Sequence, residues 1–317
     1  MRTGAAAGHR GHYHAALCYD SDPDLLAVVL PFLLDGMAAG EPVVVALRDR
    51  TAALVRAALP ADGPVSYLDP YSRPTAVIRS YREMLAGHVA AGAAQVRVVG
   101  EMPASAFGAT WDWWARYEAA TNHAYDEFPL WSLCAFDTRV TPAAVLDDVA
   151  RTHPWTALPG GRHTPNGTYT EPAAFLAEDR PMLLDPAQRT GPAVELADPT
   201  PAQARAALRR VDPGLPADDV DDLIVAVSEV VTNALRHGRP PVLSRVWTTP
   251  DRIVVTVSDG GTGPRDLFVG LLPTRGPGAG GLGLWITHQS CSHVTQQRGP
   301  DDYTLRLTAG NPQFPIG

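Results

Sequence analysis

The sequence contains no lysine, so all 26 of its basic residues are arginine. Every mechanism that needs a lysine amine is therefore excluded, including a Walker A phosphate loop and Schiff-base chemistry. The net charge of −8 also excludes a global basic field that would draw the chain to nucleic acid or to an anionic membrane. We expect neither nucleic acid nor membrane as a direct partner.

Cysteine and long apolar runs are scarce as well. Cys18, Cys134 and Cys291 are far apart and form no C-x-x-C pair. This spacing argues against a zinc or disulfide framework and fits a reduced compartment. The most apolar run, residues 25–34, is too short to span a bilayer, and no apolar core of a signal peptide is present. We therefore expect a cytoplasmic protein.

Strand-like and helix-like runs alternate over the first half of the chain, after about ten residues that we expect to be disordered. The predicted strands are 15–19, 42–47, 65–68, 95–99 and 130–136, and the predicted helices are 24–39, 51–59, 76–91, 111–122 and 142–152. This alternation predicts a parallel sheet with helices on both faces. Ligands in such sheets bind beyond the carboxyl ends of the strands, which here are residues 19–21, 69–71, 100–102 and Asp137.

Several residues of this half could have either a structural or a functional role. Glu101 is either a relic of a metal-binding acid or a polar strand end, and we favour the strand end. The tryptophans at 111, 113 and 114 could line a pocket, but their spacing is more typical of a core. A third group, His9, His12 and His14, could bind a metal. No acid or cysteine lies near them in sequence, so we interpret them as a chance cluster.

The first half is similar to the MEDS sensory domain, which is named for methanogens and methylotrophs. The matching segments are residues 14–19, 69–71, 97–102, 117–118, 133–137 and 153–154, and the resemblance covers most of 12–176. It implies a RecA-like α/β fold that senses a small molecule, for which a hydrocarbon derivative is proposed in the family. Residues 20–23 read Asp-Ser-Asp-Pro where a live RecA-like ATPase has its phosphate loop, so we expect no ATP hydrolysis here.

A stretch rich in proline, aspartate, arginine and glycine follows and predicts an exposed linker. The predicted organisation is a sensory domain at 1–176, a linker at 177–191, a second domain at 192–310 and a tail at 311–317. No histidine lies between Leu176 and Glu229. The helix that carries the phosphoacceptor of a histidine kinase therefore has no candidate in this stretch.

The second domain is organised around a predicted helix that ends near Gly238. Val220, Leu223, Ile224, Val227, Val231 and Leu235 form its expected buried stripe. Glu229 and Asn233 lie one turn apart on roughly the opposite face. A carboxylate there can accept a proton, and a carboxamide oxygen can ligate Mg²⁺. For an isolated E-x-x-x-N the simpler interpretation is a solvated helix face.

Two glycine-rich segments favour the functional interpretation. A predicted hairpin, 242–248 and 253–258, ends in Asp259, which could accept a hydrogen bond from an adenine amino group, and Gly261 and Gly263 follow it. Residues 264–276 are irregular and predict a mobile lid. Residues 278–284 then open a helix whose N-terminal amides and dipole could bind phosphates. A last hairpin is predicted at 294–297 and 303–307.

The order E-x-x-x-N-A-x-x-H-G, D-G-G-T-G and G-G-L-G-L resembles the GHKL (histidine-kinase-like) ATPase superfamily. The short lid and the missing phosphoacceptor helix are most similar to anti-sigma factor serine kinases. The resemblance implies an α/β sandwich with a mixed, largely antiparallel sheet and helices on one face, with ATP and Mg²⁺ as cofactors. It implies that Asn233 ligates Mg²⁺, that Asp259 reads adenine, and that Glu229 is the general base. The residues implied to close over the phosphates are Gly278, Gly280, Gly281, Leu282 and Gly283.

Our leading hypothesis is a cytoplasmic serine kinase that is controlled by the small-molecule sensor, binds a sigma factor and phosphorylates an anti-anti-sigma protein. Two alternatives stay open. One is a binding switch in which ATP sets partner affinity without turnover, and the other is a histidine kinase-like protein that acts on a separate partner. The sequence leaves open the sensed ligand, whether it activates or inhibits, and the oligomeric state, a homodimer included.

Overall fold

The computed structural model describes residues 1–68, 74–211, 214–272 and 282–315. The chain divides into two compact units, each with its own core. The N-terminal unit comprises Met1–Ser72, Ala76–Phe107 and Trp114–Leu176, and the C-terminal unit comprises Arg73–Thr75, Gly108–Trp113 and Ala177–Gly317. None of the described helices combines the length and the apolar character that crossing a membrane requires.

The sheet of the N-terminal unit is parallel except at one edge. Its strands are β1 (Tyr13–Tyr19), β2 (Val43–Ala46), β3 (Val65–Tyr67), β4 (Val96–Glu101), β5 (Leu130–Asp137), β6 (Trp155–Leu158) and β7 (Arg162–Pro165). They lie in the order β3-β2-β4-β5-β1-β6-β7, and only the β6–β7 pair is antiparallel. The predicted parallel α/β fold is confirmed. The β6–β7 hairpin escaped prediction because its strands are short and proline-flanked.

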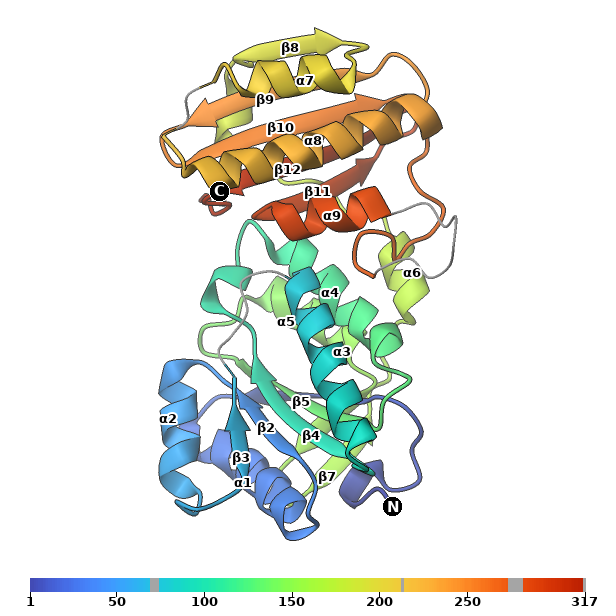
Figure 1. Cartoon of the computed structure of the whole chain (residues 1–317). Coiled ribbons are helices and arrows are strands. Elements are labelled where there is room, and N and C mark those ends of the chain that lie inside the picture. Colours follow the sequence, from blue (N-terminus) through green and yellow to red (C-terminus); the bar gives the residue numbers. More distant parts are fainter. Residues whose placement is uncertain (69–73, 212–213, 273–281, 316–317) are drawn as a thin grey trace. The chain divides into compact units, whose positions relative to one another are not determined.

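Helices cover both faces of this sheet (Figure 1). They are α1 (Asp22–Ala38), α2 (Asp49–Ala58), α3 (Pro74–Ala90), α4 (Trp111–Ala124), α5 (Ala143–Thr152) and the short α6 (Pro172–Ala177). Apolar side chains of α1 and α2 pack on one face against alternate residues of β1, among them Ala15 and Leu17. The other residues of β1 therefore point to the opposite face, where α3 and α4 contribute to a cavity.

The first ten residues are ordered, so the predicted disorder is wrong. Arg2 donates hydrogen bonds to the carbonyl oxygens of Gly11 and Leu130, at 2.5 and 2.8 Å. Thr3 donates to Glu41 and accepts from Arg97, with distances of 2.8 and 2.6 Å. These long-range contacts tie down a segment whose composition alone gave no sign of order.

A buried ion pair connects this segment to the sheet. Arg97 on β4 donates through Nε to Glu41 at 2.6 Å and through Nη1 to the carbonyl of Phe32 at 2.7 Å. Its guanidinium also lies over the ring of Trp131, 4.6 Å from the centroid. Because Arg97 is 1% exposed and Glu41 8%, neither charge can be solvated by bulk water if its partner is lost.

The sheet of the C-terminal unit is antiparallel. Its strands are β8 (Val194–Ala197), β9 (Leu243–Thr249), β10 (Arg252–Asp259), β11 (His293–Arg298) and β12 (Tyr303–Gly310), in the order β11-β12-β10-β9-β8. Every pairing between these described strands is antiparallel. The helices α7 (Pro201–Leu208), α8 (Ala217–His237) and α9 (Leu282–Ser290) lie on one face of this sheet (Figure 1). The predicted α/β sandwich is confirmed.

Helix α8 is amphipathic, as predicted, but its buried face is rotated from the predicted stripe. The buried residues are Leu223, Ile224, Ala226, Val227, Val230, Val231 and Ala234. Leu235, which we placed in the stripe, is 46% exposed. It lies about 90° around the helix from the centre of the buried face. Asn233 lies at the border of this buried face and Glu229 lies farther around the helix, and both are half-buried.

Replacing Arg97 by methionine would leave the Glu41 carboxylate buried without its countercharge. We expect the free energy of unfolding of the N-terminal unit to fall by about 3 kcal/mol. The matched control is Arg50→Met, because Arg50 pairs with Asp22 at an exposed site and its loss should leave stability nearly unchanged. Urea denaturation followed by tryptophan fluorescence measures both, and equal midpoints for the two variants would contradict the expectation.

Candidate functional site

Asn233 and Glu229, the two residues of α8 that the E-x-x-x-N spacing predicted as functional, face different neighbours. Asn233 lines a cavity of about 260 Å³ together with Val230, Ala234 and His237 of the same helix. Glu229 lies one turn earlier and faces the start of α9, because a Cβ added to Gly283 would overlap its Oε2 atom. The helix thus presents an amide to the cavity and a carboxylate beside it.

The walls of this cavity are mostly apolar. They come from α8, from β10 and β12 of the sheet, from the start of α9 and from the segment after Gly263. The apolar lining residues are Val230, Ala234, Val257, Val269, Leu284, Tyr303 and Leu305. Polar groups are few and come from Asn233, His237, Asp259, Arg265 and Asp266. An apolar slot with a few polar groups suits a flat, partly polar ring such as a purine.

Asp259 is held in one orientation at the end of β10. Its Oδ1 accepts hydrogen bonds from the backbone amides of Gly261, at 2.6 Å, and Arg239, at 3.3 Å. Among the described residues, no hydrogen bond reaches Oδ2. Gly238 and Gly261 pack so closely on this carboxylate that a Cβ at either position would overlap it. Asp259 can therefore offer a fixed acceptor to a ligand in the cavity.

Gly263 needs to be glycine for two reasons. Its φ of +73° is in the left-handed region, and a Cβ there would come within 2.5 Å of the Tyr303 ring. The backbone therefore lies flat against one wall of the cavity. Gly261 is constrained only by its neighbours, because a Cβ would meet Asp259 and the Cα of Gly238.

The remaining predicted phosphate-binding residues lie at the start of α9 or before it. Leu282 and Gly283 are its first two residues, and Leu282 is 56% exposed. Gly278, Gly280 and Gly281 lie outside the described residues, as do 69–71 in the first half. The sequence did not predict that Tyr303 and Leu305 line the cavity. Their alternation on β12 indicated only that one face of this strand is buried.

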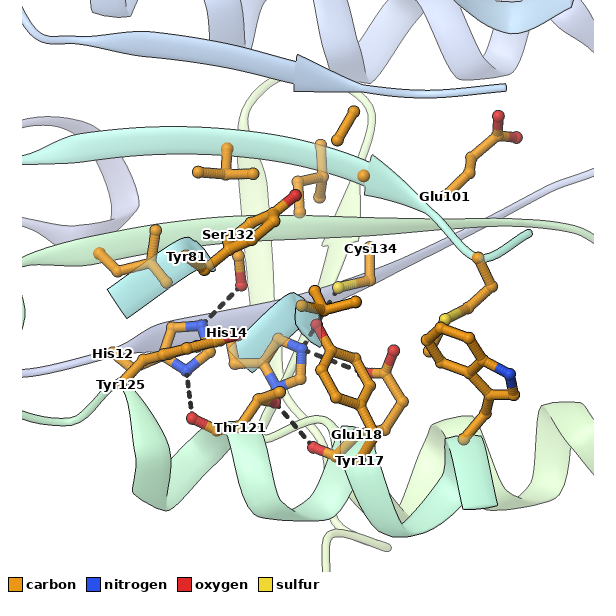
Figure 2. A pocket seen from close by; sticks show the side chains of 18 of the residues that line it. His12, His14, Tyr81, Glu101, Tyr117, Glu118, Thr121, Tyr125, Ser132 and Cys134 are labelled. Atoms are coloured by element: carbon orange, nitrogen blue, oxygen red, sulfur yellow. Dashed lines mark hydrogen bonds and ion pairs between the residues drawn. The ribbon is translucent and has the colours of Figure 1, made fainter. Parts of the chain in front are cut away.

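A second cavity, of about 80 Å³, lies in the N-terminal unit between β1, β4 and β5 on one side and α3 and α4 on the other (Figure 2). Tyr81, Trp114, Tyr117, Tyr125 and Phe136 give it an aromatic lining. The polar residues that line it are His12, His14, Glu101, Glu118, Thr121, Ser132 and Cys134. Of the segments predicted from strand ends, residues 100–102 line this cavity, whereas 19–21 and Asp137 do not.

Glu101 is fully engaged by neighbours of its own fold. Its carboxylate accepts hydrogen bonds from the hydroxyls of Tyr19 and Thr51 and from the backbone and guanidinium of Arg48. These contacts agree with a polar strand end. At the position of a phosphate loop, α1 has Asp22 and Asp24 in its first turn and Ser21 as its N-cap, so its positive end meets the chain's own carboxylates.

The three N-terminal histidines do not direct their nitrogens at one common point, although His12 and His14 line the same cavity. His9 Nε2 is 3.2 Å from the carbonyl oxygen of His12, and His12 lies between Ser132 and the carbonyl of Thr121. His14 instead meets Glu118, Cys134 and His153. The interpretation as a chance cluster overlooked this grouping, because these three residues lie more than 100 positions away in sequence.

Burial sets the protonation of this group. It lowers the pKa of His153 well below its ordinary value, with His14 adding to the effect, and it does the same for His12. Burial likewise raises the pKa of the Cys134 thiol well above its usual value, with the Glu118 charge adding to the effect. His153 and His12 are therefore neutral imidazoles at neutral pH, and Cys134 is a neutral thiol in the bare fold.

Both units match known domain families. Residues 13–154 match the family model of the MEDS domain, the methanogen/methylotroph DcmR sensory domain, and residues 195–309 match the histidine kinase-like ATPase domain. The chain is a MEDS domain followed by a histidine kinase-like ATPase domain, as both resemblances predicted. No curated protein matches the sequence.

Solved structures resemble parts of the chain. One is the crystal structure of the RsbU and RsbW domains of a Mycobacterium tuberculosis protein, with 20% identity over 40% of this chain and 35% of that one, at a TM-score of 0.28. Another is the histidine kinase domain of a blue-light activated kinase from Erythrobacter litoralis, with 26% identity over 30% of this chain and 46% of that one, at a TM-score of 0.24. The chain thus spans about a third to a half of the length of these two chains.

An alanine at position 263 would force a side chain into the left-handed region and against Tyr303. We expect Gly263→Ala to lower the free energy of unfolding of the C-terminal unit by about 1–3 kcal/mol. Gly191→Ala is the control, since its Cβ would meet nothing within 4 Å and its φ is not in that region. Denaturant titration of the two variants measures the difference, and an equal effect of both would refute the constraint.

Proposed function

We propose that the chain is a cytoplasmic, ATP- and Mg²⁺-dependent protein serine kinase whose activity the MEDS domain controls. The observation that carries this proposal is the cavity of about 260 Å³ in which Asn233, Asp259 and Gly263 meet from three segments. Glu229 lies one turn before Asn233 on the same helix. The match of residues 195–309 to the histidine kinase-like ATPase family supports a nucleotide as the occupant.

Asp259 would select the base. Its Oδ1 is committed to two backbone amides, so Oδ2 is the atom that could accept a hydrogen bond from the amino group of adenine. The flat backbone at Gly263 and the apolar side chains of Val257 and Leu305 would contact the ring faces. An acceptor at this position favours adenine, because guanine presents a carbonyl oxygen where adenine has its amino group.

Asn233 would supply its amide oxygen to Mg²⁺, which offsets the charge of the phosphates when it is bound. Glu229 would accept the proton of the attacking serine hydroxyl as the oxygen forms its bond to the γ-phosphorus and the bond to the β-phosphate oxygen breaks. The close contact between Glu229 and Gly283 keeps this carboxylate at the start of α9. The amides of this helix start, together with Gly278, Gly280 and Gly281 before it, would bind the phosphates.

The phosphoacceptor would belong to another protein. No histidine lies between Leu176 and Glu229, His153 is 0% exposed, and His163 is on strand β7. A histidine-bearing helix next to the ATPase domain is therefore missing from this part of the chain. The proposed substrate is a serine of an anti-anti-sigma protein, and a sigma factor is the proposed binding partner, both from the family resemblance.

Changing Glu229 to glutamine keeps the size of the side chain and removes the base. We expect phosphate transfer to a partner serine to fall by about 10²–10⁴-fold while ATP binding persists. The assay uses the full chain, labelled ATP with Mg²⁺ and each anti-anti-sigma protein of the source organism, with phosphoserine identified by mass spectrometry. Glu195→Gln, which alters an exposed acid on β8, is the matched control.

The outcome of this assay separates the alternatives. Transfer that is lost in Glu229→Gln and kept in the control supports the kinase. Acid-labile phosphate on a partner would show that the acceptor is a histidine and not a serine. A third outcome is ATP-dependent partner binding that persists in Glu229→Gln and occurs without any phosphate transfer. This outcome would show that the protein is a binding switch and not a kinase.

Asparagine at 259 can keep the two backbone contacts but turns an amide NH₂ toward the adenine amino group. We expect Asp259→Asn to weaken ATP binding by about 10- to 100-fold, the equivalent of one charged hydrogen bond. Titration calorimetry of the full chain with ATP and Mg²⁺ measures this affinity. Asp251→Asn in the β9–β10 turn is the control and should bind ATP like the parent protein, and an equal loss in both would refute the role of Asp259.

A further inference from the structure

Four side chains with metal-binding atoms converge in the N-terminal unit, in a place that the proposed kinase chemistry does not use. His14 comes from β1, Glu118 from α4, Cys134 from β5 and His153 from the residue after α5. One ligand atom from each lies within 4.8 Å of all the others. The Nε2 atom of His14 is 3.3 Å from the Cys134 sulfur and 3.5 Å from Glu118 Oε2. The same carboxylate oxygen is 3.4 Å from His153 Nε2.

The tautomer of His14 follows from the contacts around Asn122. The Asn122 amide nitrogen is committed as a donor to the backbone carbonyls of Glu118, Ala119 and Thr152. Its Oδ1 is therefore the atom that faces His14 Nδ1 at 3.0 Å, and Nδ1 must carry the proton. The other ring nitrogen of His14, Nε2, lies toward Glu118 and Cys134 and is the atom that a neutral imidazole would offer as a ligand.

His153 is oriented in the same way by the backbone. Its Nδ1 is 2.9 Å from the carbonyl oxygen of Val149, which can only accept, so the proton is again on Nδ1. The ring of His153 lies 4.0 Å from that of His14, centroid to centroid. The Nε2 atoms of two imidazoles and a carboxyl oxygen of Glu118 thus lie together beside the thiol of Cys134.

Two of these atoms are buried and lack a hydrogen bond. Among the residues that the structure describes, Glu118 Oε2 and His153 Nε2 have no hydrogen-bond partner, although Glu118 is 3% exposed and His153 is fully buried. A buried carboxyl oxygen and a buried imidazole nitrogen that lack partners are both unfavourable in the folded state. A cation bound among the four atoms would satisfy both at once.

We propose that His14, Glu118, Cys134 and His153 bind a divalent transition metal ion, and that zinc is the ion this donor set fits best. Tetrahedral zinc with metal–nitrogen bonds of about 2.0–2.1 Å and a metal–sulfur bond of about 2.3 Å places its ligand atoms roughly 3.3–3.6 Å apart. The three measured separations fall in that range. Two imidazoles, a thiolate and one carboxylate oxygen favour zinc over magnesium or calcium, which prefer oxygen ligands. Binding releases the Cys134 proton to solvent.

The site borders the aromatic cavity of the sensory domain. His14, Glu118 and Cys134 line that cavity, and Figure 2 shows the three side chains directed toward one another. Asn122 and the Val149 carbonyl hold the outer nitrogens of the two imidazoles, an arrangement that orients ligands at metal centres. A metal here would be the group with the highest charge that a molecule in the cavity meets.

Metal analysis of the full chain tests the proposal. Protein purified from zinc-supplemented cells without chelator should hold one zinc per chain, and replacement by Co²⁺ should give visible bands of tetrahedral cobalt and a near-ultraviolet thiolate-to-cobalt band. Cys134→Ser should remove the thiolate band and lower zinc affinity at least 100-fold. The matched control, Cys18→Ser, alters an exposed cysteine of the same strand as His14 and should behave like the parent protein.

A second variant keeps all four ligands. Asn122→Leu removes the partner of His14 Nδ1 and should weaken zinc binding by about 10- to 100-fold, with the cobalt thiolate band still present at saturation. Circular dichroism confirms that each variant is folded. Folded parent protein that neither contains zinc nor binds Co²⁺ would overturn the proposal, as would a thiolate band that survives in Cys134→Ser.

Discussion

The parallel register of β1 against β5 decides which side chains the cavity of the sensory domain contains. His14 pairs with Ser132 and Ala16 with Cys134, so every second residue of both strands faces α3 and α4. The residues between them, such as Ala15 and Leu133, belong to the apolar core under α1. A slip of one residue would turn His14 into that apolar core. Since an uncompensated polar group is costly there, the apolar face of the sheet holds the polar face in place.

In the C-terminal unit, one helix packs on the sheet and also carries two of the residues proposed to act on ATP. The buried face of α8 covers the sheet, and outside that face the helix places Asn233 at the cavity and Glu229 beside the start of α9. Because these two residues share a helix with the core residues, their positions depend on the packing of the helix rather than on a loop. Asp259 is held comparably, by backbone amides at the end of a strand that is paired on both sides. Asn233, Glu229 and Asp259 therefore lie on regular secondary structure, which holds side chains more precisely than loops do.

Local sequence patterns predicted most of the architecture. The alternation of strands and helices in the first half and the two hairpins in the second were readable because hydrophobic periodicity reflects which face is buried. Prediction failed where the determining contact is distant in sequence. The first ten residues are held by hydrogen bonds to Arg97, Gln95 and Leu130. The composition of this segment does not indicate those partners. The stripe of α8 was misjudged at Leu235 because the sheet, not the helix, decides how far the buried face extends.

For the candidate sites, the sequence by itself indicated more of the cavity in the C-terminal unit than of the cavity in the N-terminal unit. Glu229 and Asn233 are one helical turn apart, and Asp259 directly precedes its glycines, so their grouping is encoded by short-range spacing. Only the tertiary structure decided that His14, Glu118, Cys134 and His153 meet, because they lie on separate elements between 16 and 139 positions apart, counted from their residue numbers. A parallel sheet joins strands that are remote in the chain, so the proximity of their side chains follows from strand order and register, which no local pattern specifies.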